Sequence, residues 1–112
     1  MRKVILDTSF ILTAIKQKVD FFHFLKEEGI QAIVPEQTIK ELKGLGAELA
    51  LEIMQKNEFK LVKMPGKDAD SAIITFAKNN PETIVATIDS GLQRKIRNPK
   101  MVLRQKKKID II

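Results

Sequence analysis

Acidic residues follow two of the apolar runs that we predict to be buried strands. Asp7 comes directly after the run at residues 4–6, and Asp89 follows the run at residues 84–88. A hydroxyl-bearing residue and then a predicted helix follow each acid. In an open α/β sheet, a ligand lies beyond the carboxyl ends of the strands, where the strand order reverses. We therefore expect Asp7 and Asp89 to lie side by side at one edge of the sheet.

Two further acids can join this edge. Glu41 lies about two turns into a helix that we expect to open at Pro35, and Asp70 lies in the first turn of a helix after a Pro-Gly turn. Four converging carboxylates raise one another's pKa unless a cation neutralises them. The chain has no Cys and one His, which excludes the common zinc sites. The oxygen ligands favour Mg²⁺ or Mn²⁺, which can activate water and stabilise charge on a phosphate.

Each acid also has an ordinary structural interpretation. Asp7 and Asp89 can act as N-terminal helix caps, and Glu41 can be a solvated helix residue. Asp68 and Asp70 both lie where a helix N-terminus favours negative charge. Their common placement at one sheet edge is what favours a functional site.

The composition is that of one globular domain. The chain has 112 residues, 44% of them hydrophobic and 30% charged, with a net charge of +6. This positive charge favours a polyanionic partner such as nucleic acid, although it can also serve general surface solubility. The chain contains no apolar stretch near the roughly 18 residues of a membrane span, so we expect a cytoplasmic protein without membrane contact.

Strand and helix patterns alternate along the chain, which predicts an α/β fold with a mainly parallel sheet buried between helices. Arg104 to Lys108 is a basic cluster, and we expect residues 105–112 to form a basic C-terminal tail that ends in apolar residues. The strands are expected at residues 4–6, 31–34, 59–62, 84–88 and 101–103. The helices are expected at residues 10–18, 19–28, 69–78 and 90–97 and from residue 35 onward, with a break between Gly44 and Gly46.

Four segments together resemble the PIN domain family. They are VILDTSFIL, VPEQTIKELK, KDADSAIITFA and IVATIDSGLQRKIR, which occur in the family's order with comparable spacing along nearly the whole chain. The resemblance implies a single domain over residues 1–112 with a Rossmann-like three-layer sandwich, a central, mainly parallel sheet flanked by helices. The last segment is similar to the VapC-like and archaeal rRNA-processing branches of the family.

The resemblance also implies site residues and a metal cofactor. Asp70 is matched to the third acid of the family, with Asp68 as an alternative ligand or a helix cap. Ser9 matches a position that often carries a hydroxyl near the metal. The catalytic and metal-binding acids carried over by position are Asp7, Glu41, Asp70 and Asp89.

Basic residues follow the last of these acids. Arg94, Lys95 and Arg97 are expected near the mouth of the site, where they can position RNA through its phosphates. A solvated basic face is the alternative interpretation of these three residues.

The resemblance implies a Mg²⁺- or Mn²⁺-dependent endoribonuclease that leaves a 5′-phosphate and a 3′-hydroxyl. Its setting is either a toxin with an antitoxin partner or an rRNA-processing nuclease in a pre-ribosomal particle. The alternative is a weakly active or non-catalytic RNA-binding platform in ribosome biogenesis. Phe21, Phe22 and Phe24 on one short predicted helix can form a partner or homodimer surface, or they can be buried in the core.

Overall fold

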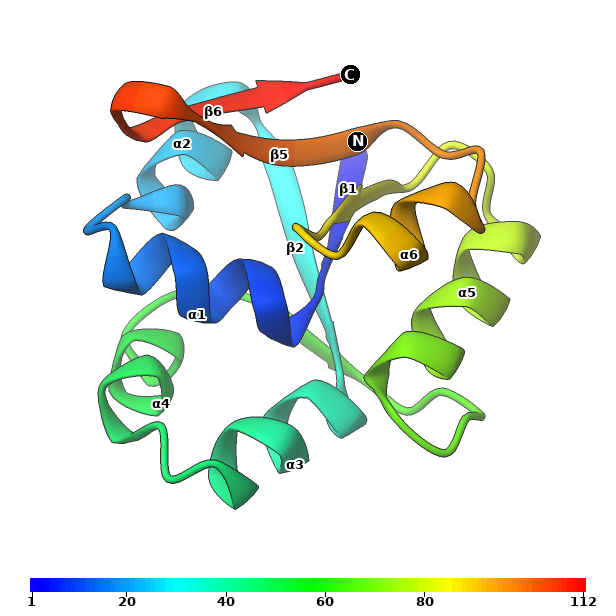
Figure 1. The fold of residues 1–112 in the computed structure, drawn as a ribbon, viewed down its shortest axis with the longest axis horizontal. Helices are drawn as coiled ribbons and strands as arrows, with labels where there is room; N and C mark the ends of the chain where they lie inside the picture. Colours follow the sequence, from blue (N-terminus) through cyan, green and yellow to red (C-terminus); the bar gives the residue numbers. More distant parts are fainter.

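A six-stranded sheet forms the centre of the protein, in the order β3-β2-β1-β4-β5-β6 (Figure 1). The computed structural model describes the backbone of residues 1–112 and every side chain except that of Lys106. The strands are β1 (Arg2–Leu6), β2 (Ile30–Pro35), β3 (Lys60–Val62), β4 (Ile84–Ala86), β5 (Lys100–Arg104) and β6 (Lys108–Ile111). The helices are α1 (Thr8–Lys16), α2 (Phe21–Glu28), α3 (Glu36–Gly44), α4 (Glu48–Gln55), α5 (Ala69–Asn79) and α6 (Ser90–Arg94), with a 3₁₀ turn at Gln105–Lys107.

The strand order reverses beside β1. From β1 the chain proceeds outward through β2 to β3, and it then returns to place β4 on the other side of β1. Strands β1 to β5 pair in parallel, and β6 is antiparallel to β5. The carboxyl ends of β1 and β4 therefore meet at the switch point, the usual position of a ligand in this class of sheet.

Alternating residues of β1 face two separate helical layers. Val4 and Leu6 pack with side chains of α1, α2, α3 and α4, whereas Ile5 packs with Val85 and with side chains of α5 and α6. Because successive side chains of a strand point to opposite faces, an unbroken apolar run such as this one suits a strand covered on both sides. The predicted three-layer α/β fold with a mainly parallel sheet is therefore confirmed.

Two glycines follow helices and adopt the left-handed backbone conformation. Gly29 follows α2 with φ of 66°, and Gly46 follows α3 with the same φ. A residue with a Cβ is disfavoured in this region, which explains the use of glycine. Gly46 also produces the expected break between α3 and α4.

The last segment differs from the expected tail. Lys108–Ile111 is a strand that pairs antiparallel with β5, and Arg104 Nε lies 3.3 Å from Asp110 Oδ2 across this hairpin. Ile109 and Ile111 pack against the core while Lys108 and Asp110 are exposed, so apolar burial on one face holds the segment in the sheet.

Two elements at the switch point are shorter than predicted. Strand β4 ends at Ala86 rather than at Ile88, and α6 ends at Arg94 rather than at Arg97. The backbone N–H of Asp89 donates to the Thr87 hydroxyl at 3.0 Å instead of to a neighbouring strand. The chain therefore leaves the sheet after Ala86, because the backbone N–H of Asp89 is bonded to a side chain at the site.

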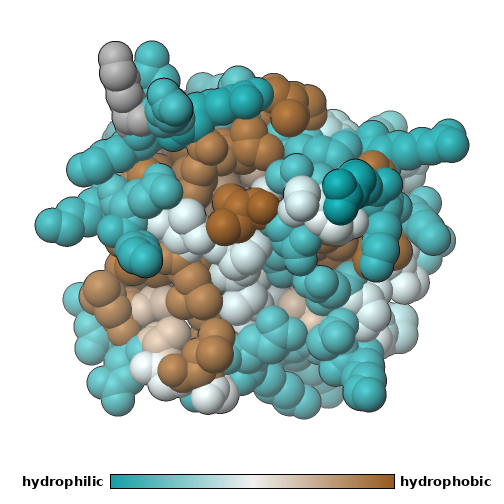
Figure 2. Space-filling model, in the orientation of Figure 1, coloured by the Kyte–Doolittle hydropathy of each residue, from teal (hydrophilic) through white to brown (hydrophobic). Residues whose placement is uncertain are grey.

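The aromatic residues of α2 are mostly core residues. Phe21 and Phe22 are buried, and Phe24 packs against the same core from a half-buried position. Exposed apolar side chains lie instead at the turn into α4, where Leu45 is 65% and Leu49 is 61% exposed. Figure 2 shows a hydrophobic area on this part of the molecule. In the described chain, no helix is long and apolar enough to cross a membrane.

Candidate active site

Asp7 lies at the carboxyl end of β1 and is only 3% exposed. Its carboxylate oxygen Oδ2 accepts hydrogen bonds from the hydroxyls of Ser9 and Thr87, each at 2.8 Å. Burial raises the pKa of Asp7 above its usual value, although these two hydroxyls act in the opposite direction. The side chain is not the cap of α1, since it forms no capping hydrogen bond to the helix.

The hydroxyls of Ser9 and Thr87 connect β1 to β4. Their oxygens lie 3.3 Å apart, and the backbone N–H of Ile88 lies 3.4 Å from Ser9 Oγ. Gln93 Nε2 donates to the Thr87 carbonyl at 2.9 Å, which fixes the turn after β4 against α6. Ser9 and Thr87, which are 78 positions apart in the sequence, thus form one hydrogen-bonded unit around Asp7.

Asp89 is the N-terminal cap of α6. Its Oδ1 accepts from the backbone N–H groups of Gly91 and Leu92 at 2.8 and 3.3 Å. Only one carboxylate oxygen is used for these two capping contacts. Capping therefore orients the Asp89 carboxylate and remains compatible with a second role for its other oxygen.

Glu41 connects three segments at this edge. Its Oε1 accepts from the Thr8 hydroxyl at 2.7 Å, and its Oε2 accepts from the backbone N–H of Ala69 at 2.9 Å. Thr8 begins α1, and Ala69 begins α5. Glu41 therefore holds the start of α5, and with it Asp70, beside the end of β1.

The acids Asp68 and Asp70 have different environments. Asp68 caps α5 in a reciprocal capping box with Ser71, and the backbone N–H of Ser71 is the main cause that lowers the pKa of Asp68. The pKa of Asp70 is instead raised, first by lost hydration and then by the negative charges of Asp7, Asp89, Asp68 and Glu41. The negative charges of the other four acids therefore all raise the pKa of Asp70.

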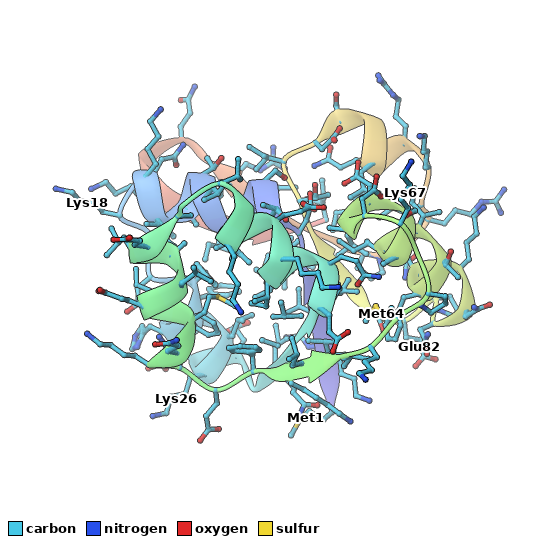
Figure 3. All side chains as sticks on the ribbon, turned by 90° about the horizontal axis from the view of Figure 1, so that it is seen from below. Met1, Lys18, Lys26, Met64, Lys67 and Glu82 are labelled. Carbon is cyan, nitrogen blue, oxygen red and sulfur yellow. The ribbon has the colours of Figure 1, made fainter. Side chains whose placement is uncertain are left out.

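The loop between β3 and α5 is held by Gln37, which the sequence did not indicate, and by Gly66 of the predicted Pro-Gly turn. Gln37 Nε2 donates to the carbonyls of Met64 and Gly66 at 2.7 and 2.9 Å. Gly66 has φ of 146°, and a Cβ there would lie 2.7 Å from the Ala72 nitrogen, so only glycine fits. Figure 3 labels Met64 and Lys67 on this loop.

The structure therefore brings Asp7, Glu41, Asp70 and Asp89 to one edge of the sheet, where their charges interact. Among the described residues, none of the four forms an ion pair with Lys or Arg. The oxygen donors and their mutual repulsion fit a hard divalent cation. As the described side chains stand, however, no three of them approach closely enough to hold one ion.

The basic residues after Asp89 lie on the surface. Arg94 ends α6, and Lys95 and Arg97 follow it with exposed side chains. A pocket of about 850 Å³ lies elsewhere, among Met1, Ile30 and other residues near the amino ends of the strands. The carboxylates occupy the opposite end of the sheet, so this pocket is not their site.

The fold matches that of a known class of proteins. Residues 4–106 match the family described as PIN like domain. This match spans most of the chain, and the chain belongs to that family.

Two known proteins are similar to this chain. The chain is 30% identical to Ribonuclease VapC4 of Methanocaldococcus jannaschii, over 99% of this chain and 97% of that protein. It is also similar to the solved structure of the PIN domain endonuclease Utp24, with a TM-score of 0.85 and 27% identity over 97% of this chain and 90% of that one. The predicted membership of the PIN family is confirmed.

Proposed function

We propose that this protein is a divalent-metal-dependent endoribonuclease that hydrolyses RNA at the edge formed by β1 and β4. The observation that carries the proposal is the joint placement of Asp7, Glu41, Asp70 and Asp89 without a described basic partner. Family membership and the similarity to a ribonuclease and to a PIN domain endonuclease support the same reaction class.

In this proposal the residues have separate roles. Asp7, Asp70 and Asp89 would hold Mg²⁺ or Mn²⁺, with Ser9 and Thr87 orienting Asp7. The bound ion would supply an activated water and stabilise negative charge on the phosphate. Glu41 already uses both oxygens in hydrogen bonds, which supports a positioning role through Thr8 and Ala69 in this structure.

RNA would be positioned by its backbone. Arg94, Lys95 and Arg97 are exposed at and after the C-terminal end of α6, where their charges can contact phosphates without reading sequence. Asp68, which caps α5, would act on the site through the start of that helix rather than as a ligand.

The two relatives suggest two biological settings. Similarity to Ribonuclease VapC4 is compatible with a toxin held inactive by a small antitoxin. Similarity to Utp24 is compatible with a nuclease of rRNA processing in a pre-ribosomal particle. Co-purification of the tagged protein from its native cells would distinguish a small partner protein from ribosomal precursor RNA.

The reaction is tested with purified protein, single-stranded RNA and Mn²⁺. Asp7→Asn and Asp89→Asn should each abolish cleavage, because the charge needed for the cation is lost. Asn also caps helices well, so α6 should persist in Asp89→Asn. Asp110→Asn is the matched control, since this exposed acid pairs with Arg104 on the β5–β6 hairpin. Equal cleavage by all four proteins would refute the proposed site.

A non-catalytic RNA-binding platform is the second candidate. It is favoured by one observation, that no three described carboxylates approach closely enough to hold one ion. Calorimetric titration with Mn²⁺ separates the two candidates. A folded protein that binds RNA but gives no heat with Mn²⁺ would be such a platform.

A further inference from the structure

A second basic group of the protein lies away from the carboxylates. A surface pocket of about 310 Å³ is bounded by the end of α1, by α2 and by the β5–β6 hairpin. Lys18 and Lys107 line it together with Phe24 and Ile109. In Figure 1, the α1–α2 turn and this hairpin lie on the left of the molecule, whereas α6 lies on the right.

Lys18 and Lys107 share a backbone conformation that lysine rarely adopts. Their φ angles are 59° and 60°, and they are the non-glycine residues with positive φ in the described chain. A side chain is disfavoured in this left-handed region, and such residues tend to occur where ligands bind. Two such residues, distant in the sequence, line the same pocket.

The end of α1 shows that glycine would suit the position of Lys18. The N–H of Lys18 bonds to the Ile15 carbonyl and that of Val19 to the Ala14 carbonyl, at 3.0 and 2.8 Å. These two bonds define the helix ending in which the left-handed residue is usually glycine. Helix α3 ends with the same pair of bonds, and there the chain does place glycine, at Gly46.

The hairpin position of Lys107 leads to the same conclusion. Arg104 pairs with Lys108, so residues 105–107 form a three-residue loop. A loop of this length commonly ends in a left-handed residue, for which glycine is the usual choice. Both lysines therefore stand where backbone geometry favours glycine, so a lysine at each position has a conformational cost.

Two acids, Asp20 and Glu27, also line this pocket, and each has a partner on α2. Asp20 caps α2 by accepting from the backbone N–H of His23 at 3.0 Å. Glu27 lies 3.5 Å from His23 Nε2. Within the described part of the chain, Lys18 and Lys107 form no ion pair with a carboxylate. Figure 3 shows Lys18 projecting from the end of α1 away from the body of the protein.

We propose that Lys18 and Lys107 form a second phosphate-binding site for single-stranded RNA, at the far end of α1 from Asp7. Taking RNA as the ligand rests on the proposed function. The partly buried Phe24 and Ile109 give the pocket an apolar wall against which a base can pack. Helix α1 has nine residues and thus spans about 14 Å, so one RNA strand can contact both this site and the carboxylate edge.

The test replaces both lysines by glycine in one variant. Binding of a short fluorescent single-stranded RNA is followed by anisotropy in EDTA, where no cleavage occurs, over a range of salt concentrations. The paired variant should bind RNA more weakly, and its salt dependence, log K against log salt, should be shallower by about 1.4 for two lost phosphate contacts. The matched control is Lys56→Gln with Lys78→Gln, which removes the same charge from exposed positions elsewhere and should leave the slope unchanged.

Thermal unfolding completes the test. Because glycine suits both positions, the glycine variant should melt at the same or a higher temperature than the wild type. A lower melting temperature would mean that the lysines serve packing, and it would overturn the proposal. So would an unchanged salt slope, or a polyglutamate peptide that displaces the RNA as well as unlabelled RNA does, which would assign the site to an acidic protein.

The measurement is independent of catalysis. If the protein fails to cleave RNA but binds it through Lys18 and Lys107, the nuclease proposal falls and the second site stands. If it cleaves RNA while the glycine variant binds normally, only the second site is refuted.

Discussion

Replacing Glu41 separates its structural contribution from its charge. In Glu41→Ala, the hydroxyl of Thr8 and the buried N–H of Ala69 both lose their acceptor. Glu41→Gln can keep both contacts, since its amide oxygen can accept from Ala69 and its NH₂ group can donate to the Thr8 oxygen. The two variants therefore differ mainly in the hydrogen bonds that they retain.

The expected magnitudes follow from these two contacts. A hydrogen bond to a charged group contributes about 1.5–3 kcal/mol, so the two together contribute about 3–6 kcal/mol. Part of this is offset, because removing Glu41 relieves its repulsion with Asp7 and Asp70. We expect Glu41→Ala to lower the free energy of unfolding without metal by about 2–4 kcal/mol, and Glu41→Gln by about 1 kcal/mol or less.

Urea denaturation in EDTA measures the free energies of unfolding, and RNA cleavage with Mn²⁺ measures the functional effect. If Glu41 acts by positioning, Glu41→Gln should keep much of the activity at a temperature where it is folded, and Glu41→Ala should lose more. Equal stability of Glu41→Ala and wild type would refute the structural argument. Complete loss of activity in a stable, folded Glu41→Gln would show that the charge itself is needed at the reacting centre.

Two further predictions concern stability. In EDTA, the pKa values of Asp7 and Asp70 are raised in the folded state. The contribution of these two carboxyl groups to stability is therefore fully present below about pH 3.8 and is lost as the pH rises through the raised pKa values. Added Mn²⁺ should reverse this loss near neutral pH, and equal urea midpoints with and without Mn²⁺ would contradict that expectation. Asn98 donates from Nδ2 to the carbonyls of three residues at the end of α5 and before β4, so Asn98→Ala should lower the free energy of unfolding by about 2–4 kcal/mol, whereas Asn57→Ala, which loses one exposed contact, should change it by less than about 1 kcal/mol. Equal urea midpoints for these two variants would show that the buried amide adds nothing.

The sequence predicted the architecture because its strongest signals are local. Branched apolar runs mark the central strands, and Gly29 and Gly46 mark helix ends that need a left-handed residue. The pattern at residues 108–111 also alternates between polar and apolar residues, as a half-buried strand does. We predicted a basic tail with an apolar end there, without using this short alternation.

The contacts around the acids could be predicted only in part. The position of an acid at a strand end follows from the switch-point rule, which placed Asp7 and Asp89 together. The contacts of Glu41 with Ala69 and of Gln37 with Met64 depend instead on where a loop about thirty residues later in the sequence passes. No local pattern encodes such a contact, because it arises only when β3 and α5 are packed.

The four acids differ in how firmly the protein holds them, and this difference bears on how a cation would be bound. Asp7 is held by two hydroxyls, Asp89 by the N-terminus of α6, and Glu41 by Thr8 and Ala69. Asp70 is exposed, and no hydrogen bond from the described residues holds its carboxylate. Its pKa is raised first by lost hydration and then by repulsion from the other acids, and a cation would remove that repulsion. Asp70 is therefore the carboxylate most free to move toward a bound ion.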